Sequence, residues 1–356
     1  MTFTTQDFFA ALDEPCVGAE VKKDAQHKLG YVRVPGVVDL SYSKRQTLNG
    51  CPRLFKLREM NDMRTRTSSV DTAYGHAFAA GVQSFLVDQD VDRAFCELLK
   101  FWDVDVEDAK PTAKKSLWMC CVKLRQFIEF VYPMNFEGKW KVATMRDGRP
   151  AVELMYYIKV GDKFSQQGHI DIVLQSIETG ELCVLEIKTG GGETHEAKWA
   201  NSDQTTGYNV VLDGVAAIEG LRNRYQVIYL YCDTKSMELE SGTVGYGFTM
   251  FHFPKSPKAK VDYINTLLLD IARIELYQDA EFWPKNGNHC HTYNRSCEFF
   301  GVCDLDSMIN AGHTGDNSYN SMSLDEVDYV FELNELLEIQ RPAEDFNYME
   351  NHLGEM

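Results

Sequence analysis

In two neighbouring stretches of the chain, "HIDIVL" and "VLEIK", side chains alternate with a period of two residues between two faces. This alternation predicts two strands of a hairpin. The first stretch divides into two faces: His169, Asp171 and Val173 on one, and Ile170, Ile172 and Leu174 on the other. The second places Val184, Glu186 and Lys188 together on one face. The turn "ETGE" between the stretches contains Gly180, which tolerates a positive φ.

The predicted hairpin sets Asp171 directly opposite Glu186, with Cβ atoms about 5 Å apart. Like charges at that distance destabilise a sheet unless a cation lies between them, and oxygen ligands of this kind suit a hard divalent metal. Lys188 follows on the same face, where it could orient a nucleophile or stabilise a developing negative charge. The alternative is a solvated strand face with a weak ion pair.

The remaining pattern predicts helices that precede the strands and others that alternate with them. Helices are expected at 41–61 with a break at Asn49–Pro52, and at 68–87, 90–103, 112–131, 202–220 and 257–279. Strands are expected at 151–160, 166–175, 181–188, 224–233 and 245–254. This order fits an α/β domain with a mixed sheet. The chain has no Gly-x-x-x-x-Gly-Lys-Ser/Thr run, so we expect no nucleotide-driven motor.

Three further side chains are candidates for the same site. Gln204 and Tyr208 are four residues apart on the helix predicted at 202–220, so they share one face. Their uncharged donors and acceptors suit a phosphate, a base edge or a metal-bound water. His76 lies on the small-residue face of its helix, where a structural role is the common alternative to metal binding.

The charge of the chain is unevenly distributed along its 356 residues. Residues 304–356 contain thirteen acids and one base, so this tail holds −12 of the net charge of −17 and leaves −5 for residues 1–303. Residues 41–66 are locally basic, with seven Lys or Arg against two acids. A phosphate-binding patch is therefore possible despite the overall sign, although a solvated helix face explains these bases equally well.

The N-terminal stretch is acidic and lacks the pattern of a signal peptide, and no apolar run is long enough to cross a membrane. These features predict an intracellular, cytoplasmic protein without membrane partners, in the host cytoplasm if the chain is phage-encoded. The ten cysteines are then better interpreted as core residues or metal ligands than as disulfides.

Three of the cysteines, Cys290, Cys297 and Cys303, fall in the polar stretch "CHTYNRSCEFFGVC". Such a loop is a poor place for core residues, whereas thiolate ligation of a soft metal explains them. Cys51, at the break between two predicted helices, is the natural fourth ligand. The six residues between Cys290 and Cys297 leave His289 or His291 as substitutes for Cys290.

Together these motifs resemble the RecB-type branch of the PD-(D/E)XK nuclease superfamily. The resemblance rests on "YGHAFAAG", "GHIDIV", "LEIKTG" and "QTTGY", in the order of the family. It implies that His76, Asp171 and Glu186 bind Mg²⁺ or Mn²⁺, that Lys188 positions or activates the attacking water, and that Gln204 with Tyr208 orients the substrate. Glu153, in "AVELMYY", ranks below these candidates.

The pattern of one early and three late cysteines resembles the iron–sulfur nucleases of this superfamily, including AddB-type domains and CRISPR adaptation nucleases. The resemblance implies a [4Fe–4S] cluster held by Cys51, Cys290, Cys297 and Cys303, with a four-thiolate zinc site as the alternative. This chain departs from those relatives in its longer spacing after Cys290.

The resemblance implies a restriction-endonuclease-like α/β core, with a central mixed sheet flanked by helices, a helical N-terminal part and a C-terminal iron–sulfur-bound segment. The domain organisation expected is an N-terminal extension at 1–40, a nuclease domain at 41–303, and an acidic linker with an amphipathic helix at 304–356. That helix, expected over 323–340, either docks on the domain, screens DNA or binds a protein partner.

The function expected is that of a metal-dependent DNA nuclease, an exonuclease acting on single-stranded ends before an endonuclease. DNA recombination, repair or turnover, in a phage for example, would be its setting. One alternative is a non-catalytic DNA-binding module of a recombination or packaging complex on the same fold, and another is a zinc protein of the transcription-factor kind. The paired carboxylates with Lys188 argue for the enzyme, because a binding module has no use for them.

Overall fold

A computed structural model describes residues 31–61, 70–102, 115–190, 196–234, 247–292, 295–301, 303 and 321–340. Residues 1–30 of the expected N-terminal extension, most of the acidic linker and the last residues of the chain lie outside this described part. No helix within the described part has the length and apolar character needed to cross a membrane.

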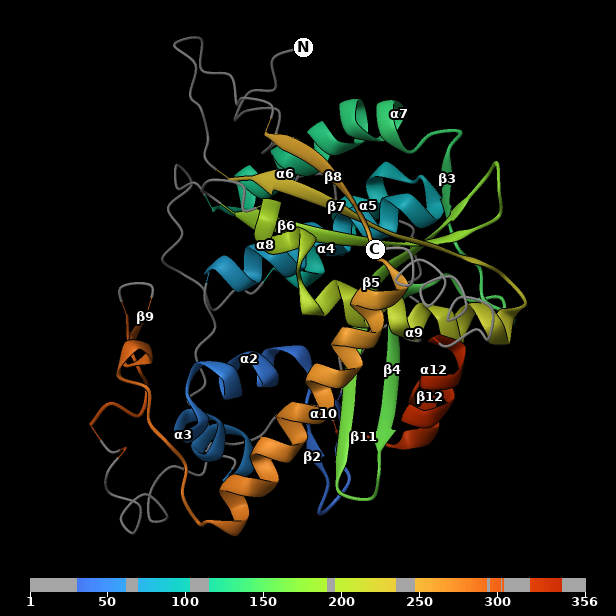
Figure 1. The fold of residues 1–356 in the computed structure, drawn as a ribbon. Helices are drawn as coiled ribbons and strands as arrows, with labels where there is room; N and C mark the ends of the chain where they lie inside the picture. Colours follow the sequence, from blue (N-terminus) through green and yellow to red (C-terminus); the bar gives the residue numbers. More distant parts are fainter. Residues whose placement is uncertain are drawn as a thin grey trace, which may run out of the picture.

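An eight-stranded mixed sheet forms the centre of the fold (Figure 1). Its main path runs in the order β12 (Tyr329–Glu332), β4 (Val152–Val160), β5 (Phe164–Ser176), β6 (Leu182–Gly190), β7 (Asn223–Asp233), β8 (Phe248–Pro254). The short strands β2 (Val38–Asp39) and β3 (Trp140–Val142) pair with the two ends of β5. β6 and β7 are parallel, and so are β12 and β4, whereas β4, β5 and β6 form an antiparallel meander.

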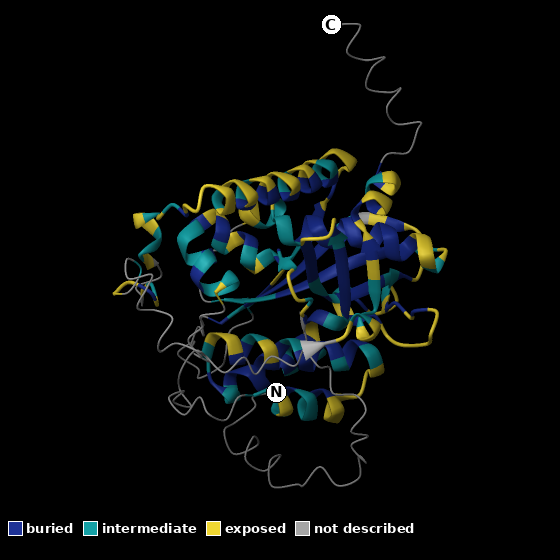
Figure 2. Ribbon diagram, turned by 90° about the horizontal axis from the view of Figure 1, so that it is seen from below, coloured by how far each residue is buried: buried dark blue, intermediate teal, exposed yellow. Residues whose placement is uncertain are grey.

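Helices cover both faces of this sheet, and a separate apolar core lies on each side. One layer consists of α4 (Val70–Asp88), α5 (Val91–Phe101), α6 (Leu117–Gln126), the π-helical turn η3 (Phe127–Val131) and α7 (Tyr132–Asn135). The opposite layer consists of α9 (Asp203–Glu219), α10 (Pro257–Asp279) and α12 (Leu333–Gln340). Figure 2 shows the strands buried between helices whose outer surfaces are exposed. The expected α/β architecture with a flanked mixed sheet is confirmed.

A smaller group of helices follows β2, which pairs with the first residues of β5. It comprises α2 (Tyr42–Gly50), α3 (Pro52–Phe55) and η2 (Lys56–Met60). The predicted break falls where expected, because Cys51 is extended and Pro52 begins the next helix. Two minor ladders and three short segments complete the described part: β1 (Tyr31–Val32) with β11 (Ser321–Met322), β9 (His291–Thr292) with β10 (Arg295–Ser296), α8 (Glu196–Ala200), η4 (Gly287–His289) and η5 (Leu324–Glu326).

The C-terminal segment differs from the single amphipathic helix expected over 323–340. Residues 329–332 form β12, which extends the edge of the sheet beyond β4, and the only α-helix in this described segment is Leu333–Gln340. Phe331 and Leu336 are buried against α9, where Gly214 leaves room for both side chains. Part of the apolar face is therefore used inside the chain, while Val330 and Ile339 remain exposed. The sequence pattern did not predict the strand, because it does not reveal a sheet edge that lacks a neighbour.

This docking predicts a large difference between two adjacent substitutions. Phe331→Ala should lower the free energy of unfolding by about 3–5 kcal/mol, because it empties a buried site, whereas Val330→Ala, at a position that is 40% exposed, should cost less than about 1 kcal/mol. Urea unfolding followed by circular dichroism measures both. Equal effects would show that the C-terminal segment does not contribute to the core.

Candidate active site

The candidate site lies where β5 and β6 separate. Their ladder pairs Val173 with Val184 and ends at Ile172 with Leu185, after which β6 continues beside β7 alone. One step beyond the last pair, the same register places Asp171 level with Glu186. The opposition of these two acids expected from the sequence is confirmed, and it occurs at the point where the sheet forks.

The alternation expected along β5 holds on one side of Asp171 but not across it. Ile172 packs in the core beneath α4, as the pattern predicts, whereas Ile170 packs in the opposite core beneath α9 and α10. A regular strand would place both on one face, so the prediction for Ile170 was wrong. The ladder with β4 lacks a pair between Glu153 and Asp171 at this level, and Glu153 has a φ of 49°, so the regular alternation is interrupted here.

Glu186 is buried, Asp171 is half-buried, and the charge of Glu186 acts on the Asp171 carboxyl. Glu186 is 1% exposed; its Oε1 pairs with the ammonium of Lys188, and its Oε2 has no hydrogen-bond partner within the described residues. Asp171 accepts the backbone N–H of Ile187 on Oδ2 at 3.1 Å. Burial first, and then the nearby charges of Glu186 and Glu153, raise the pKa of Asp171 well above its ordinary value.

Lys188 is the cation at the centre of these contacts. Burial alone would lower its pKa, but the carboxylates of Glu186 and Asp171 outweigh this effect and raise it. Its ammonium also donates to Gln204 Oε1 at 3.2 Å. Lys188 is therefore charged at neutral pH and held at the end of β6, where it could contact an anionic substrate.

The helix α9 supplies the other two side chains expected at the site. Gln204 donates from Nε2 to the Tyr208 hydroxyl at 2.9 Å, so one chain of hydrogen bonds runs from Lys188 through Gln204 to Tyr208. Burial, followed by the charges of Glu186 and Asp171, raises the pKa of Tyr208 well above its ordinary value, which keeps the phenol protonated. The structure thus brings together five of the six residues expected at the site, Asp171, Glu186, Lys188, Gln204 and Tyr208.

His76 is the sixth, and it lies on α4 close to the end of β6. A Cβ atom on its neighbour Gly75 would be 3.5 Å from Thr189 Oγ1. The side chain of His76 is exposed at the surface of α4, and partial desolvation lowers the pKa of its imidazole, which is neutral at pH 7, as metal ligation requires. No contact within the described residues joins His76 to Asp171 or Glu186, and its role as a ligand stays a prediction.

The donor set suits a hard divalent cation. The carboxylates of Asp171 and Glu186 lie level with each other, and one oxygen, Oε2 of the buried Glu186, lacks a donor among the described residues. In the described part, however, no group of three His, Cys, Asp or Glu side chains has the geometry of a complete metal site. Asp171 and Glu186 fit as a two-residue carboxylate site, in which much of the coordination of a Mg²⁺ ion would come from water and substrate.

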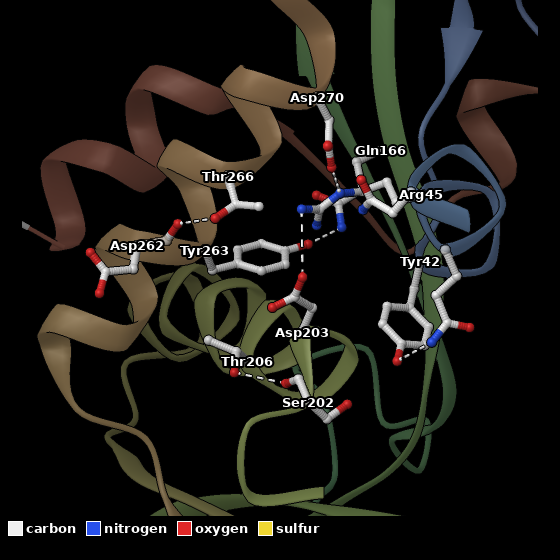
Figure 3. A network of polar contacts seen from close by, with 12 residues as sticks. Tyr42, Arg45, Gln166, Ser202, Asp203, Thr206, Asp262, Tyr263, Thr266 and Asp270 are labelled. Atoms are coloured by element: carbon white, nitrogen blue, oxygen red, sulfur yellow. Dashed lines mark hydrogen bonds and ion pairs between the residues drawn. The ribbon is translucent and has the colours of Figure 1, made fainter. Parts of the chain in front are cut away.

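A buried ionic network fixes the N-terminus of α9, next to Gln204 (Figure 3). Arg45 on α2 is 2% exposed and donates from Nε to Asp270 Oδ2 of α10 at 2.8 Å. Its Nη2 lies 3.7 Å from Asp203 Oδ2, on the first residue of α9, and its Cζ is 5.1 Å from the centre of the Tyr263 ring. Arg45 therefore links three helices behind the site.

The basic stretch at 41–66 is largely occupied by such internal contacts. Besides Arg45, Lys44 pairs with Asp39 at 2.8 Å and Arg58 pairs with Glu298. The ion pairs of Lys44, Arg45 and Arg58 thus hold the α2–α3 group in place. Arg64 and Arg66 lie outside the described residues, and the phosphate-binding patch stays a prediction.

The cysteine-bearing segments lie side by side, as the choice of Cys51 requires. The backbone N–H of Arg53 donates to the Pro284 carbonyl at 3.1 Å, and the Arg53 guanidinium donates to the Cys303 carbonyl at 3.2 Å. Cys297 and Cys303 border a small core of Leu57 and Phe299. Burial and, more weakly, Cys290 and Cys303 raise the pKa of Cys297.

These contacts do not amount to a formed metal site. No group of three Cys or His side chains among the described residues has metal-binding geometry. His289 nevertheless lies close to Cys51. A Cβ atom on Gly50, the residue before Cys51, would overlap the imidazole ring of His289. Both Cys290 and His289 therefore lie near the first cysteine, and the choice between them stays open.

Comparison with known proteins gives one match to a family and a weak structural likeness. No curated protein matches the sequence. A solved structure of a candidate exonuclease from Eubacterium rectale is similar at a TM-score of 0.42 and 10% identity, over 82% of this chain and 91% of that chain, which is too distant to support an argument.

The family model that matches is that of the PD-(D/E)XK nuclease superfamily, over residues 39–304. The matched region contains the fork of β5 and β6, the helix α9 and all four cysteines of the two adjoining segments. It covers most of the chain, and the mixed sheet flanked by helices agrees with the restriction-endonuclease-like fold of this superfamily. The chain belongs to the PD-(D/E)XK nuclease superfamily.

Proposed function

We propose that this nuclease is a deoxyribonuclease of the RecB-type branch that depends on Mg²⁺ or Mn²⁺ and degrades DNA from single-stranded ends. The observation that carries the proposal is the pair of acids at the fork, the buried Glu186 and the half-buried Asp171, with the charged Lys188 beside them. Burying like charges is costly, and a protein retains them where a cation or a reaction uses them.

Asp171 and Glu186 would hold the ion, which when bound lowers the pKa of a water ligand and polarises the scissile phosphate. Lys188, already charged and fixed by Gln204, would contact a non-bridging phosphate oxygen or the attacking water. Tyr208 holds the amide of Gln204, so that its carbonyl oxygen is directed at Lys188. Each side chain then has one partner that orients it before the substrate arrives.

The preference for ends follows from the position of the cysteine-bearing segments. The described residues of 284–303 pack against α2 and α3, so the last part of the nuclease region returns to its first part beside the sheet. A chain closed in this way by a [4Fe–4S] cluster on Cys51, Cys290, Cys297 and Cys303 would favour the threading of a free strand. A zinc ion on the same thiolates would close it equally well.

Substitutions at the fork should abolish cleavage without unfolding the protein. We expect Lys188→Met to reduce the rate by roughly 10²–10³-fold, because it removes the only cation found beside the acids in the described part, and Glu186→Gln to reduce it at least as far. Cleavage of end-labelled DNA in Mn²⁺ measures the rate, and circular dichroism verifies the fold. Parental activity in Glu186→Gln would refute the assignment.

The same assay separates end-dependent cleavage from internal cleavage. Linear single-stranded DNA should be degraded, while a circular single strand of the same sequence should survive at equal enzyme concentration. Cleavage of both substrates at the same rate would make the protein an endonuclease and would remove the argument for threading.

The cysteine assignment predicts a coloured protein. Protein purified without oxygen should be brown and contain iron and acid-labile sulfide, and Cys51→Ser or Cys297→Ser should lose both the colour and stability, because metal binding contributes to folding. Cys96→Ser on α5, a half-buried cysteine outside the two segments, is the control and should keep the colour. A colourless protein with stoichiometric zinc would select the alternative metal, and one without metal would refute both.

A further inference from the structure

Glu153 on β4 has a backbone conformation that disfavours its own side chain. Its φ is 49°, in the left-handed region, which a residue with a Cβ atom adopts only at a cost in conformational energy. Glycine would avoid most of this cost, and asparagine part of it. A glutamate at such a position indicates that its carboxylate, rather than the path of the backbone, is what the site requires.

The register of the sheet places this carboxylate beside the two acids at the fork. β4 and β5 pair Val152 with Ile172 and Leu154 with Ile170, and the pair between them is missing from the ladder. That missing pair is Glu153 with Asp171. Since Asp171 is also level with Glu186, three adjacent strands each contribute one acid at the same level of the sheet.

Gln83 on α4 contacts both Glu153 and Asp171 at the level where their ladder pair is missing. Its Nε2 donates to Glu153 Oε1 at 2.6 Å and lies 3.3 Å from the backbone carbonyl oxygen of Asp171. Asp171 has no partner in the ladder with β4. Gln83 is 6% exposed, so water does not easily replace these contacts. One amide thus fixes both the side chain of Glu153 and the backbone of Asp171.

A second observation is an oxygen of Glu186 that lacks a donor. Glu186, 1% exposed, leaves Oε2 without a hydrogen-bond partner among the described residues, although Lys188 pairs with its other oxygen. Three carboxylates at one level of the sheet with one paired ammonium leave an excess of negative charge in the described part, which a hard divalent ion would neutralise.

We propose that Glu153 is a third carboxylate of the divalent-metal site, binding the ion directly or through a metal-bound water, and that Gln83 positions it. The inference rests on the proposed metal-dependent function but goes beyond its ligand set. It assigns to the chain a site with one acid from each of β4, β5 and β6, which needs no contribution from His76.

Mn²⁺ binding to the full protein, freed of Mg²⁺ and Mn²⁺ but keeping any metal bound to its cysteines, tests this without any measurement of cleavage. The protein without metal means here the protein without added Mg²⁺ or Mn²⁺. Titrations followed by the electron paramagnetic resonance of free Mn²⁺ would compare the parental protein with Glu153→Gln, Glu153→Gly and Glu186→Gln. Glu178→Gln, in the exposed turn of the same hairpin, is the matched control. Thermal unfolding of each variant without metal gives the second readout.

We expect both Glu153 variants to bind Mn²⁺ roughly 10- to 100-fold more weakly and the control to bind it unchanged. Without metal, Glu153→Gln should be at least as stable as the parent, because it keeps an acceptor for Gln83 while removing a buried charge. Glu153→Gly should fold readily, because it relieves the backbone conformation.

Parental Mn²⁺ affinity in either folded Glu153 variant would overturn the inference, as would a Glu153→Gln protein whose only change is lower stability. Glu186→Gln separates this failure from a failure of the proposed function. If only Glu186→Gln loses affinity, the metal site exists and Glu153 is not part of it. If Glu186→Gln and both Glu153 variants all bind Mn²⁺ as tightly as the parent, the metal site itself is absent from the fork and both proposals fail.

Discussion

The repulsion between the carboxylates at the fork of β5 and β6 is the constraint on which the rest of the structure depends. Asp171 lies level with the buried Glu186, so desolvation and the charge of Glu186 together raise the pKa of Asp171. Lys188 offsets part of this repulsion, and the hydrogen bonds of Gln204 and Tyr208 hold Lys188 in place. Without a sheet strong enough to fix these strands, the acids would simply separate.

The surrounding architecture supplies that rigidity from two directions. β6 remains paired with the parallel strand β7 after it leaves β5, which keeps Glu186 and Lys188 on a strand inside the sheet. Arg45 joins α2, α9 and α10 behind the site, so the helix that carries Gln204 is fixed at its first residue. The helices that precede the sheet in sequence and the segment that bears the late cysteines are therefore parts of one support for the site.

Much of this was predictable from local patterns, because most elements obey them. The hairpin around Gly180, the opposition of Asp171 and Glu186, and the shared face of Gln204 and Tyr208 each follow from a period of 2 or 3.6 residues. Glu153 was ranked below the other candidates, because alternation along a strand cannot indicate a residue with positive φ. β12 was missed for a related reason: a strand added to a sheet edge depends on a distant partner rather than on its own sequence.

The most direct test of the central claim is to locate the ion. Crystals grown with Mn²⁺ and measured near the manganese absorption edge would show its position by anomalous scattering. The account predicts a peak between the carboxylates of Asp171 and Glu186, about 2–2.5 Å from an oxygen of each. A well-measured anomalous map with no peak at the fork, or with its main peak elsewhere on the protein, would contradict it.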